Sequence, residues 1–256
     1  MGIAEGKRAL VIGVANDRSL AWSITQELRK QGAQIALTYQ GDALKKRVEP
    51  LAEQVGAKIV GELDVTSDEQ IAATFAGIDK MWGGLDMLVH AVAFAEREDL
   101  RDRFLNVSRK NFSRSLEISA YSLVALARAA EPLMERTGGS IVTLTYIGAV
   151  RAVPNYNVMG VAKATLEACV RYLAADLGPK NIRVNAISAG PARTLSSSAI
   201  RDFYSMAHEV EQRAPLRRAM KNEEVGGMAA ALLSDLGSGV TGQTIYVDVG
   251  YSIVGM

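Results

Sequence analysis

RALVIGVANDRSLAWSITQELRKQGAQIALTY, residues 8–39, joins two apolar runs by a helical pattern. The runs at 8–14 and 34–39 are rich in aliphatic and β-branched side chains, as buried strands are. Residues 19–32 repeat apolar side chains at helical spacing and end at Gly32. A strand, a helix and a second strand in this order predict a βαβ unit with parallel strands.

The same alternation continues to the end of the chain. Further strands are predicted at 58–65, 86–92, 140–146, 182–188 and 243–249, and helices at 42–55, 67–81, 109–135, 156–178 and 222–233. Seven apolar strands separated by helices indicate the α/β class, as a single-domain Rossmann fold over residues 1–256. We expect a doubly wound seven-stranded parallel sheet with helices on both faces. The segments 94–108 and 193–218 follow strand ends outside the alternation and are predicted to form the substrate site.

Composition excludes several classes of protein. The 256 residues are 48% hydrophobic and carry a net charge of +1, which indicates a soluble globular protein without attraction to nucleic acid. Cys169 is the only cysteine, and His90 and His208 have no partners at metal-ligand spacing, so no metal site is predicted. No apolar run reaches the roughly 18 residues of a membrane span, and the start of the chain lacks the pattern of a signal peptide. We therefore expect a cytoplasmic protein.

The first turn after the first strand suits a dinucleotide phosphate. GVANDRSLA (13–21) keeps only Gly13 of the three glycines in the usual fingerprint, so the motif alone is a weak signal. Its place between a strand and a helix is a stronger signal. Ser19 is predicted to be the N-cap of that helix, whose free N–H groups and dipole favour a pyrophosphate.

Two further strand ends bear on the choice of cofactor. Gln40 follows the second strand, where an acidic residue commonly binds the adenosine ribose. No arginine stands beside Gln40 to pair with a 2′-phosphate, and Asp42 would repel one, so the charges favour NADH over NADPH. Asp64 and Val65 end the third predicted strand, at a position suited to the adenine ring, and Asp64 can also act as a helix cap.

Several stretches together resemble the bacterial enoyl-acyl-carrier-protein reductases, a divergent branch of the short-chain dehydrogenase/reductases. They are GVANDRSLA (13–21), LDVT (63–66), HAVAFA (90–95), TYIG (145–148), YNVMGVAKA (156–164), RVNAISAGPARTL (183–195) and VTGQTIYVDVGY (240–251). The resemblance extends from about residue 4 to the C-terminus. It implies reduction of enoyl thioesters on acyl carrier protein with NADH, in type II fatty-acid synthesis, by a homotetramer assembled through two long helices.

The resemblance also implies roles for single residues. Tyr146, Tyr156 and Lys163 would be catalytic, and Ala95, Tyr146 and Tyr156 would contact the substrate. The residues that would bind the cofactor are Gly13, Ser19, Leu20, Gln40, Asp64, Val65, Val92, Lys163, Ala192, Thr194 and Leu195. Only Arg201 is basic within 196–209, where relatives often carry several basic residues that could meet the acidic carrier protein.

The spacing of tyrosine and lysine fits the chemistry that the resemblance implies. Ketone reductases of this class pair a tyrosine with a lysine four residues later, but Met159 holds that place here and Tyr156 stands seven residues before Lys163. If both lie in one helix, they share a face and are separated by about 10 Å along the axis. An enoyl thioester accepts hydride at its β-carbon and collects charge on an oxygen three bonds away, which calls for a more distant donor. We also expect Lys163 to lower the pKa of Tyr156.

Two other functions remain compatible with the residues. A carbonyl reductase of the same fold is disfavoured by Met159. A non-catalytic dinucleotide sensor would need neither the tyrosine–lysine pair nor an apolar substrate segment. Activity with a crotonyl thioester, compared with an acetoacetyl thioester, separates the three.

Overall fold

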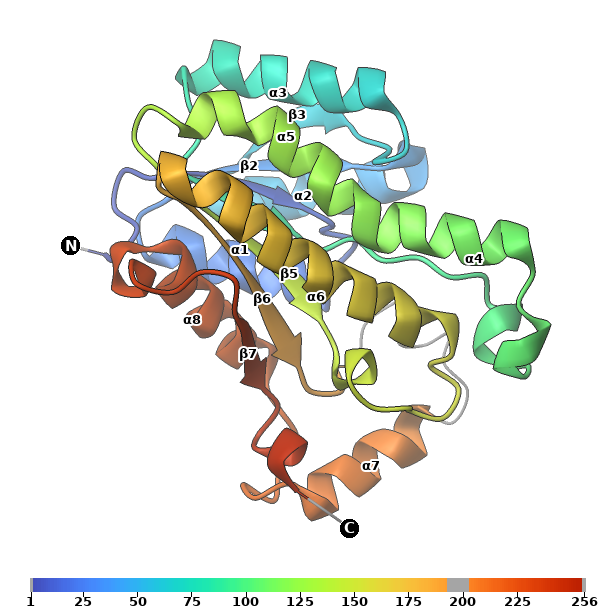
Figure 1. Cartoon of the computed structure of the whole chain (residues 1–256). Coiled ribbons are helices and arrows are strands. Elements are labelled where there is room, and N and C mark those ends of the chain that lie inside the picture. The colour runs from blue at the N-terminus through green and yellow to red at the C-terminus, as the bar shows by residue number, and fades with distance from the viewer. Residues whose placement is uncertain (1, 193–202, 255–256) are drawn as a thin grey trace.

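A computed structural model of the chain describes residues 2–192 and 203–254. Its seven strands form one parallel sheet in the order β3-β2-β1-β4-β5-β6-β7 (Figure 1). The strands are β1 (Arg8–Ile12), β2 (Gln34–Tyr39), β3 (Lys58–Glu62), β4 (Met87–His90), β5 (Gly139–Thr145), β6 (Ile182–Ala189) and β7 (Thr244–Val247). The predicted doubly wound, Rossmann-type parallel sheet is confirmed, and its strand order reverses between β1 and β4.

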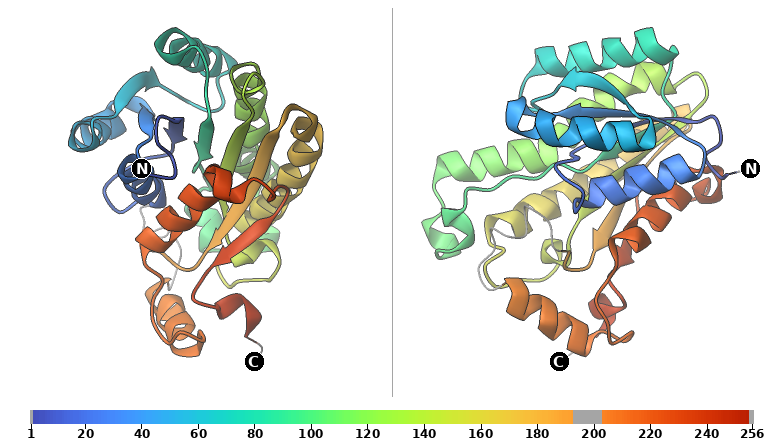
Figure 2. Two further views of the ribbon diagram at one scale, coloured as in Figure 1. Left: turned by 90° about the vertical axis from the view of Figure 1, so that its left-hand side faces the viewer. Right: turned by 180° about the vertical axis from the view of Figure 1, so that it is seen from behind.

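Helices cover both faces of the sheet (Figure 2). One face carries α1 (Leu20–Lys30), α2 (Gly41–Val55) and α8 (Asn222–Leu233). The other carries α3 (Asp68–Trp82), α5 (Ser122–Met134) and α6 (Val158–Leu177). Two further helices, α4 (Arg109–Leu116) and α7 (Phe203–Arg213), lie toward the carboxyl ends of the strands (Figure 1). Among the described residues, no helix combines the length and apolar character needed to cross a membrane.

Alternation along each strand divides the core into two layers. In β1, Ala9 and Val11 pack with α1, α2 and α8, whereas Leu10 and Ile12 pack with α3, α5 and α6. All four side chains are at most 2% exposed. Since successive residues of a strand point to opposite faces, a strand covered on both sides must be apolar throughout. This is why the strands read as continuous apolar runs.

The long helix predicted at 109–135 is interrupted. It consists of α4, a π turn at Glu117–Tyr121 and α5. In a π turn each backbone N–H bonds to the carbonyl five residues earlier, so the i−4 pairing of the α-helix is locally broken. The carbonyl oxygen of Ile118, inside the turn, accepts a hydrogen bond from Oγ of Ser122 at 2.7 Å.

Other boundaries differ from prediction near the expected substrate segments. The helix predicted from residue 156 begins at Val158. Part of the segment 193–218 forms α7, which was not predicted, and residues 193–202 lie outside the described residues. The segment 94–108 contains two short 3-10 turns, Glu98–Leu100 and Phe104–Asn106.

Candidate active site

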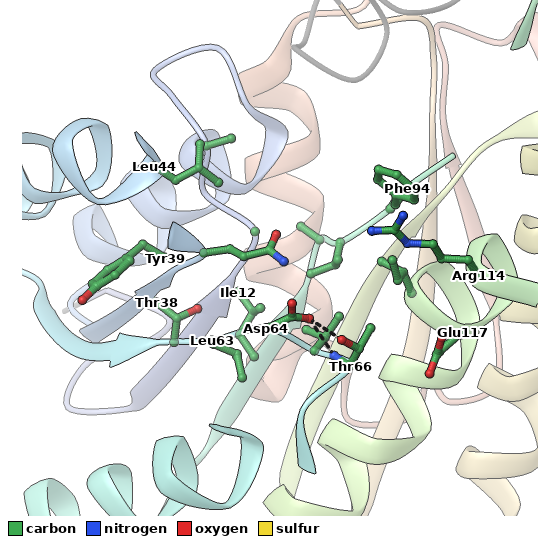
Figure 3. Close-up of a pocket in the computed structure, with 18 of the residues that line it drawn as sticks. Ile12, Thr38, Tyr39, Leu44, Leu63, Asp64, Thr66, Phe94, Arg114 and Glu117 are labelled. Atoms are coloured by element: carbon green, nitrogen blue, oxygen red, sulfur yellow. Dashed lines mark hydrogen bonds between the residues drawn. The ribbon is translucent and has the colours of Figure 1, made fainter. Parts of the chain in front are cut away.

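A cavity of about 720 Å³ opens at the carboxyl ends of β1 to β4 (Figure 3). Five residues that were predicted to bind the cofactor line it: Gly13, Gln40, Asp64, Val65 and Val92. They come from four separate strand ends, which the parallel sheet brings to one edge. The cavity lies where the strand order reverses, the usual place for a dinucleotide in an open α/β sheet.

Gly13 allows β1 to end close against β4. Its φ of +107° lies in the region that favours glycine. A Cβ at this position would overlap the backbone carbonyl of Ala91, which follows β4. The single glycine that survives from the usual fingerprint is therefore needed for the close approach of these two strand ends.

The turn after β1 leads into α1 as predicted, with Ser19 at the N-cap. The hydroxyl of Ser19 accepts no capping hydrogen bond from the helix, and its Oγ donates to the carbonyl oxygen of Asn16 at 2.7 Å. Leu20 is the first helical residue and packs against the core. Neither Ser19 nor Leu20 is among the described residues that line the large cavity.

Asp64 presents a fixed carboxylate to the cavity (Figure 3). Its Oδ1 accepts hydrogen bonds from the backbone N–H of Thr66 at 2.9 Å and from the Thr66 hydroxyl at 2.7 Å. The Thr66 N–H and hydroxyl, with the side chain of Gln40, hold the pKa of Asp64 below its ordinary value although burial opposes them. Asp64 is therefore ionised at neutral pH and oriented by its neighbours.

The opposite wall of the cavity comes from α4 and the chain after β4 (Figure 3). The guanidinium of Arg114 lies 4.7 Å from the centroid of the Phe94 ring and forms a 3.0 Å ion pair with Glu96. Phe94 begins the segment 94–108 that was expected at the substrate site, whereas Arg114 was not predicted as a cavity residue. Nothing in the sequence distinguishes Arg114 from a solvated helical arginine, and only the packing of α4 across the strand ends brings it here.

The π turn holds the chain after β4 in place. The backbone N–H of Phe94 donates to Oγ of Ser119 at 2.9 Å.

His90, at the end of β4, is hydrogen-bonded through both ring nitrogens. Its Nε2 lies 2.8 Å from Oγ of Ser122, the residue after the π turn, and its Nδ1 lies 2.7 Å from the hydroxyl of Thr143. The Ser122 hydroxyl already donates to Ile118, so it accepts from Nε2–H, and Nδ1 accepts from Thr143. Burial lowers the pKa of His90 to about 3, so the imidazole is neutral and its two ring nitrogens join β4 to its neighbours.

Tyr146 and Tyr156 meet in a small apolar cluster beside this chain segment. Their ring centroids are 4.9 Å apart, in an edge-to-face arrangement. The cluster also contains Leu100, Met159, Ala95 and Val153. Burial raises the pKa of Tyr146 to about 12 and raises the pKa of Tyr156 further. The structure therefore does not support the expectation that Lys163 lowers the pKa of Tyr156.

Tyr156 lies outside the helix, contrary to the prediction. Asn157, the N-cap of α6, has φ 44° and ψ −120°, which no helix contains. Such a backbone costs a non-glycine residue about 1–3 kcal/mol. The argument that Tyr156 and Lys163 share a helix face by their seven-residue spacing is therefore wrong, because the chain turns sharply between Tyr156 and Val158. The apolar cluster, and not helix geometry, places the Tyr156 ring.

Lys163 is a buried cation on the second turn of α6. It is 6% exposed, and its Nζ donates to the carbonyl oxygen of Leu144 at 2.8 Å. Burial lowers the pKa of Lys163 to about 8, while the nearby carboxyl of Glu167 opposes this shift. Glu167 is 7% exposed and accepts from the hydroxyl of Thr145 at 2.8 Å. A buried ammonium held at the end of β5 can bind hydroxyl groups.

The remaining predicted cofactor residues are Ala192, Thr194 and Leu195. Ala192 lines a second cavity of about 480 Å³, which it shares with Arg18 at the β1–α1 turn and with residues of α7 and α8. Thr194 and Leu195 lie outside the described residues. The structure thus gathers five of the predicted residues at one cavity, and it places Tyr146, Tyr156 and Ala95 in the apolar cluster.

Comparison with known proteins points to one family. The family model described as enoyl-(acyl carrier protein) reductase matches residues 13–252. An enoyl-acyl-carrier-protein reductase (NADH) of Rhizobium meliloti is 55% identical over 255 residues, covering 100% of this chain and 93% of its own. One of Nostoc sp. is 56% identical and covers 98% of both chains.

Solved structures agree with this result. The reductase of Anaplasma phagocytophilum in complex with NAD has a TM-score of 0.96 and 52% identity, and the match covers 100% of this chain and 97% of that one. The reductase of Bacillus cereus with NADP⁺ and an indole naphthyridinone has a TM-score of 0.97 and 49% identity, over 100% of both chains.

Proposed function

The chain belongs to the enoyl-acyl-carrier-protein reductase family, and from this premise we propose that it reduces the trans-2 double bond of enoyl thioesters with NADH in type II fatty-acid synthesis. One observation carries the proposal. The segment 91–95 lines the dinucleotide cavity with Val92 and Phe94, and its last residue, Ala95, belongs to the apolar cluster that contains the two tyrosines. A cofactor in the cavity and a substrate beside the tyrosines would therefore meet along this segment.

The cavity fits the adenosine end of the cofactor. Its volume of about 720 Å³ suits a large ligand. Gln40 offers both a donor and an acceptor to a ribose hydroxyl, and Asp64 with Val65 would flank the adenine. Glu62, whose Oε1 accepts from the backbone N–H of Gly41 at 3.1 Å, adds a negative charge at the same turn as Asp42. These two carboxylates favour NADH over NADPH, because they repel a 2′-phosphate.

Tyr156 would act on the thioester oxygen. Bound NADH supplies the hydride that the β-carbon accepts, which leaves negative charge on that oxygen. The raised pKa keeps the Tyr156 hydroxyl protonated at neutral pH, so it can donate a hydrogen bond to the forming enolate. A donor aimed at a developing oxyanion in a buried site stabilises the transition state by about 3–4 kcal/mol. Tyr146, against the Tyr156 ring, would flank the same pocket.

Lys163 would hold the nicotinamide ribose. With a pKa of about 8 it is mostly protonated at neutral pH, and its ammonium has donors for the ribose hydroxyls besides the one given to Leu144. The same positive charge favours the enolate. Val92, Ala192, Thr194 and Leu195 would complete the nicotinamide side, and Gly13, Ser19 and Leu20 the pyrophosphate side.

The structure also bears on the rival carbonyl reductase. Met159, at the place of the usual tyrosine, is 6% exposed and packs in the apolar cluster, with its sulfur 3.9 Å from Oγ of Ser119. A buried thioether can neither donate nor carry a proton to a ketone oxygen. Mixing the protein with NADH and crotonyl thioester tests the proposal, because oxidation of NADH is expected with this substrate and not with acetoacetyl thioester. The reverse preference would favour the rival.

The proposal also covers the carrier protein, the cellular compartment and the oligomeric state. The substrate would arrive on acyl carrier protein, and the enzyme would work in the cytoplasm as a homotetramer. Tyr121 in the π turn and Tyr172 on α6 support the assembly, since these aromatic side chains are 49% and 76% exposed on the two long helical elements. Aromatic side chains that are exposed in a single chain are often buried when subunits associate. Substitution of Tyr172 by Glu, followed by a mass measurement in solution, tests this assignment.

A further inference from the structure

The side chain of Asn157 ties two separate segments together. Its Nδ2 donates to the carbonyl oxygen of Asp99 at 2.9 Å and to that of Asp102 at 2.8 Å. Both partners are carbonyl oxygens, so the atom that faces them must be the amide nitrogen. The two hydrogens of this nitrogen thereby bridge the turn before α6 and the chain between β4 and α4.

The two hydrogen bonds of Asn157, called the tie below, reach a segment that packs against the tyrosine cluster. Asp99 and Leu100 are the buried residues of the segment 97–106, at 8% and 4% exposure. Leu100 packs with Tyr156 and Met159. The neighbouring residues 101–106 are exposed, so little apolar contact holds that part of the segment. The amide of Asn157 supplies polar contacts on either side of the buried Leu100.

The backbone of Asn157 links the same tie to Tyr156. The carbonyl oxygens of Tyr156 and Asn157 accept from the N–H groups of Met159 and Gly160, both at 3.0 Å, and so begin α6. The φ of 44° at Asn157 would suit glycine better than any other residue. A glycine could make this turn, but it could not make the two side-chain hydrogen bonds.

We propose that Asn157 is a positioning residue for the reduction, which holds the segment 99–102 against the Tyr156 turn and so fixes both the tyrosine ring and the Leu100 wall beside it. This inference rests on the proposed function. Asn157 itself need not touch the substrate or the cofactor. Loss of the tie should loosen the substrate side of the site and leave the cavity for the cofactor intact.

Two variants remove the donor without forbidding the turn. Asn157→Gly can still adopt the positive φ, and Asn157→Asp keeps the shape of the side chain. Neither variant has a side-chain amide N–H to donate. We expect kcat/KM for crotonyl thioester to fall about tenfold in both, the loss of roughly one net hydrogen bond, with an unchanged Kd for NADH. Asn181→Gly is the matched control, because Asn181 also has a positive φ, of 56°, but lies immediately before β6. This variant should behave as the wild type.

A pH profile distinguishes the tie from a general structural role. A protonated carboxyl can donate one hydrogen bond and an ionised one cannot. The ratio of the activity of N157D to that of N157G should therefore rise as the pH falls from about 8 to about 5, toward the ordinary pKa range of a carboxyl.

Hydrogen exchange provides a readout without substrate. Peptides covering 98–106 should exchange faster in both variants than in the wild type and in the Asn181 control.

The outcomes separate this inference from the proposed function. A wild type that does not reduce crotonyl thioester overturns the function, and faster exchange in the variants then still demonstrates the tie. An active wild type with unchanged kcat/KM in both variants overturns the positioning role, whatever the exchange rates. A constant activity ratio of the two variants across the pH range also overturns it, because the lost donor would then not be the cause.

Discussion

The rings of Tyr146 and Tyr156 stand edge to face, with centroids 4.9 Å apart and an angle of 66° between their planes. Gly148 lies beneath both, and a Cβ there would overlap the Tyr156 ring and touch the Tyr146 ring. Edge-to-face pairs are favourable because the positive edge of one ring meets the negative face of the other. The position of each tyrosine therefore depends on the other, and their chemical roles should be tested together.

Tyr156→Phe should slow enoyl reduction by about 100-fold, since it removes a donor to the developing oxyanion. The lost hydrogen bond forms mainly in the transition state, so kcat should fall more than KM rises. NADH affinity should stay the same. The measurement is the rate of NADH oxidation with crotonyl thioester, under conditions where the chemical step limits the rate.

Tyr146→Phe and the double variant complete this test. If Tyr146 also reaches the oxygen, the double variant should lose more than either single variant but less than their product. Wild-type kcat in both Tyr156→Phe and the double variant would show that neither hydroxyl serves the enolate. Met159→Tyr should restore little activity to Tyr156→Phe, because residue 159 packs inside the cluster.

Lys163→Ala should weaken NADH binding by tenfold or more, since about 1.4 kcal/mol of lost hydrogen bonding has that effect. Lys180→Ala is the matched control. Lys180 is 43% exposed and pairs with Glu131 and Glu135 at 2.8 and 2.7 Å, so its loss should leave cofactor affinity unchanged. Fluorescence titration with NADH measures both, and equal affinity in the wild type and the Lys163 variant would remove Lys163 from the cofactor site.

The alternation of apolar strands and helices was sufficient to predict the architecture, because burial on both faces leaves a pattern in every strand. The site was only partly predictable. Strand ends converge in any parallel sheet, so Gly13, Gln40, Asp64 and Val65 could be placed together before the structure was known, whereas Val92 was assigned by the family resemblance. Arg114 could not, because its place at the cavity depends on how α4 packs across residues distant in sequence.

Local backbone geometry was the other feature that the sequence did not predict. A π turn uses the same residues as an α-helix, so the sequence of 117–121 does not reveal the interruption in the long helix. The helical pattern of 156–178 likewise extended past its true start, because the φ of Asn157 depends on the hydrogen bonds of its side chain to a distant segment. Sequence periodicity carries no information on such contacts.

Cofactor preference should respond to charge at the turn after β2. The wild type should have a higher kcat/KM with NADH than with NADPH, since Asp42 and Glu62 both stand at this turn. Asp42→Arg should lower the ratio of kcat/KM with NADH to kcat/KM with NADPH about tenfold. The substitution replaces a carboxylate that repels the 2′-phosphate by a guanidinium that can pair with it. Asp42→Asn is the control for simple loss of charge. A wild type that prefers NADPH would contradict the charge argument.

Two adjacent glycines of α8 should respond in opposite directions to alanine. A Cβ on Gly226 would lie 2.7 Å from the carbonyl oxygen of Ser23 in α1, whereas a Cβ on Gly227 meets nothing within 4 Å. Gly226→Ala should therefore force α8 from α1 and destabilise the fold by about 1–3 kcal/mol. Gly227→Ala should stabilise it by about 0.5–1 kcal/mol through helix propensity. Urea unfolding of the two variants checks both signs.

Lys163 should also make stability depend on pH. Its pKa is about 8 in the folded protein against an ordinary 10.5, so between these values the unfolded chain binds more protons than the folded one. The free energy of unfolding then rises with pH in this window. From pH 8 to 10 the gain from this group should reach about 2 kcal/mol. Above that range the tyrosines oppose it, because Tyr146 has a pKa of about 12 in the folded protein and ionises earlier when unfolded.

Lys163→Met isolates this contribution, since every other titrating group is common to both proteins. The methionine side chain fills similar space without a charge, so the variant should be the more stable protein at pH 8. Its advantage over the wild type should shrink as the pH rises to 10, where the wild-type lysine folds in its neutral form at less cost. Urea unfolding without cofactor at several pH values gives the difference directly. A difference that stays constant from pH 8 to 10 would show that Lys163 keeps its ordinary pKa in the folded protein.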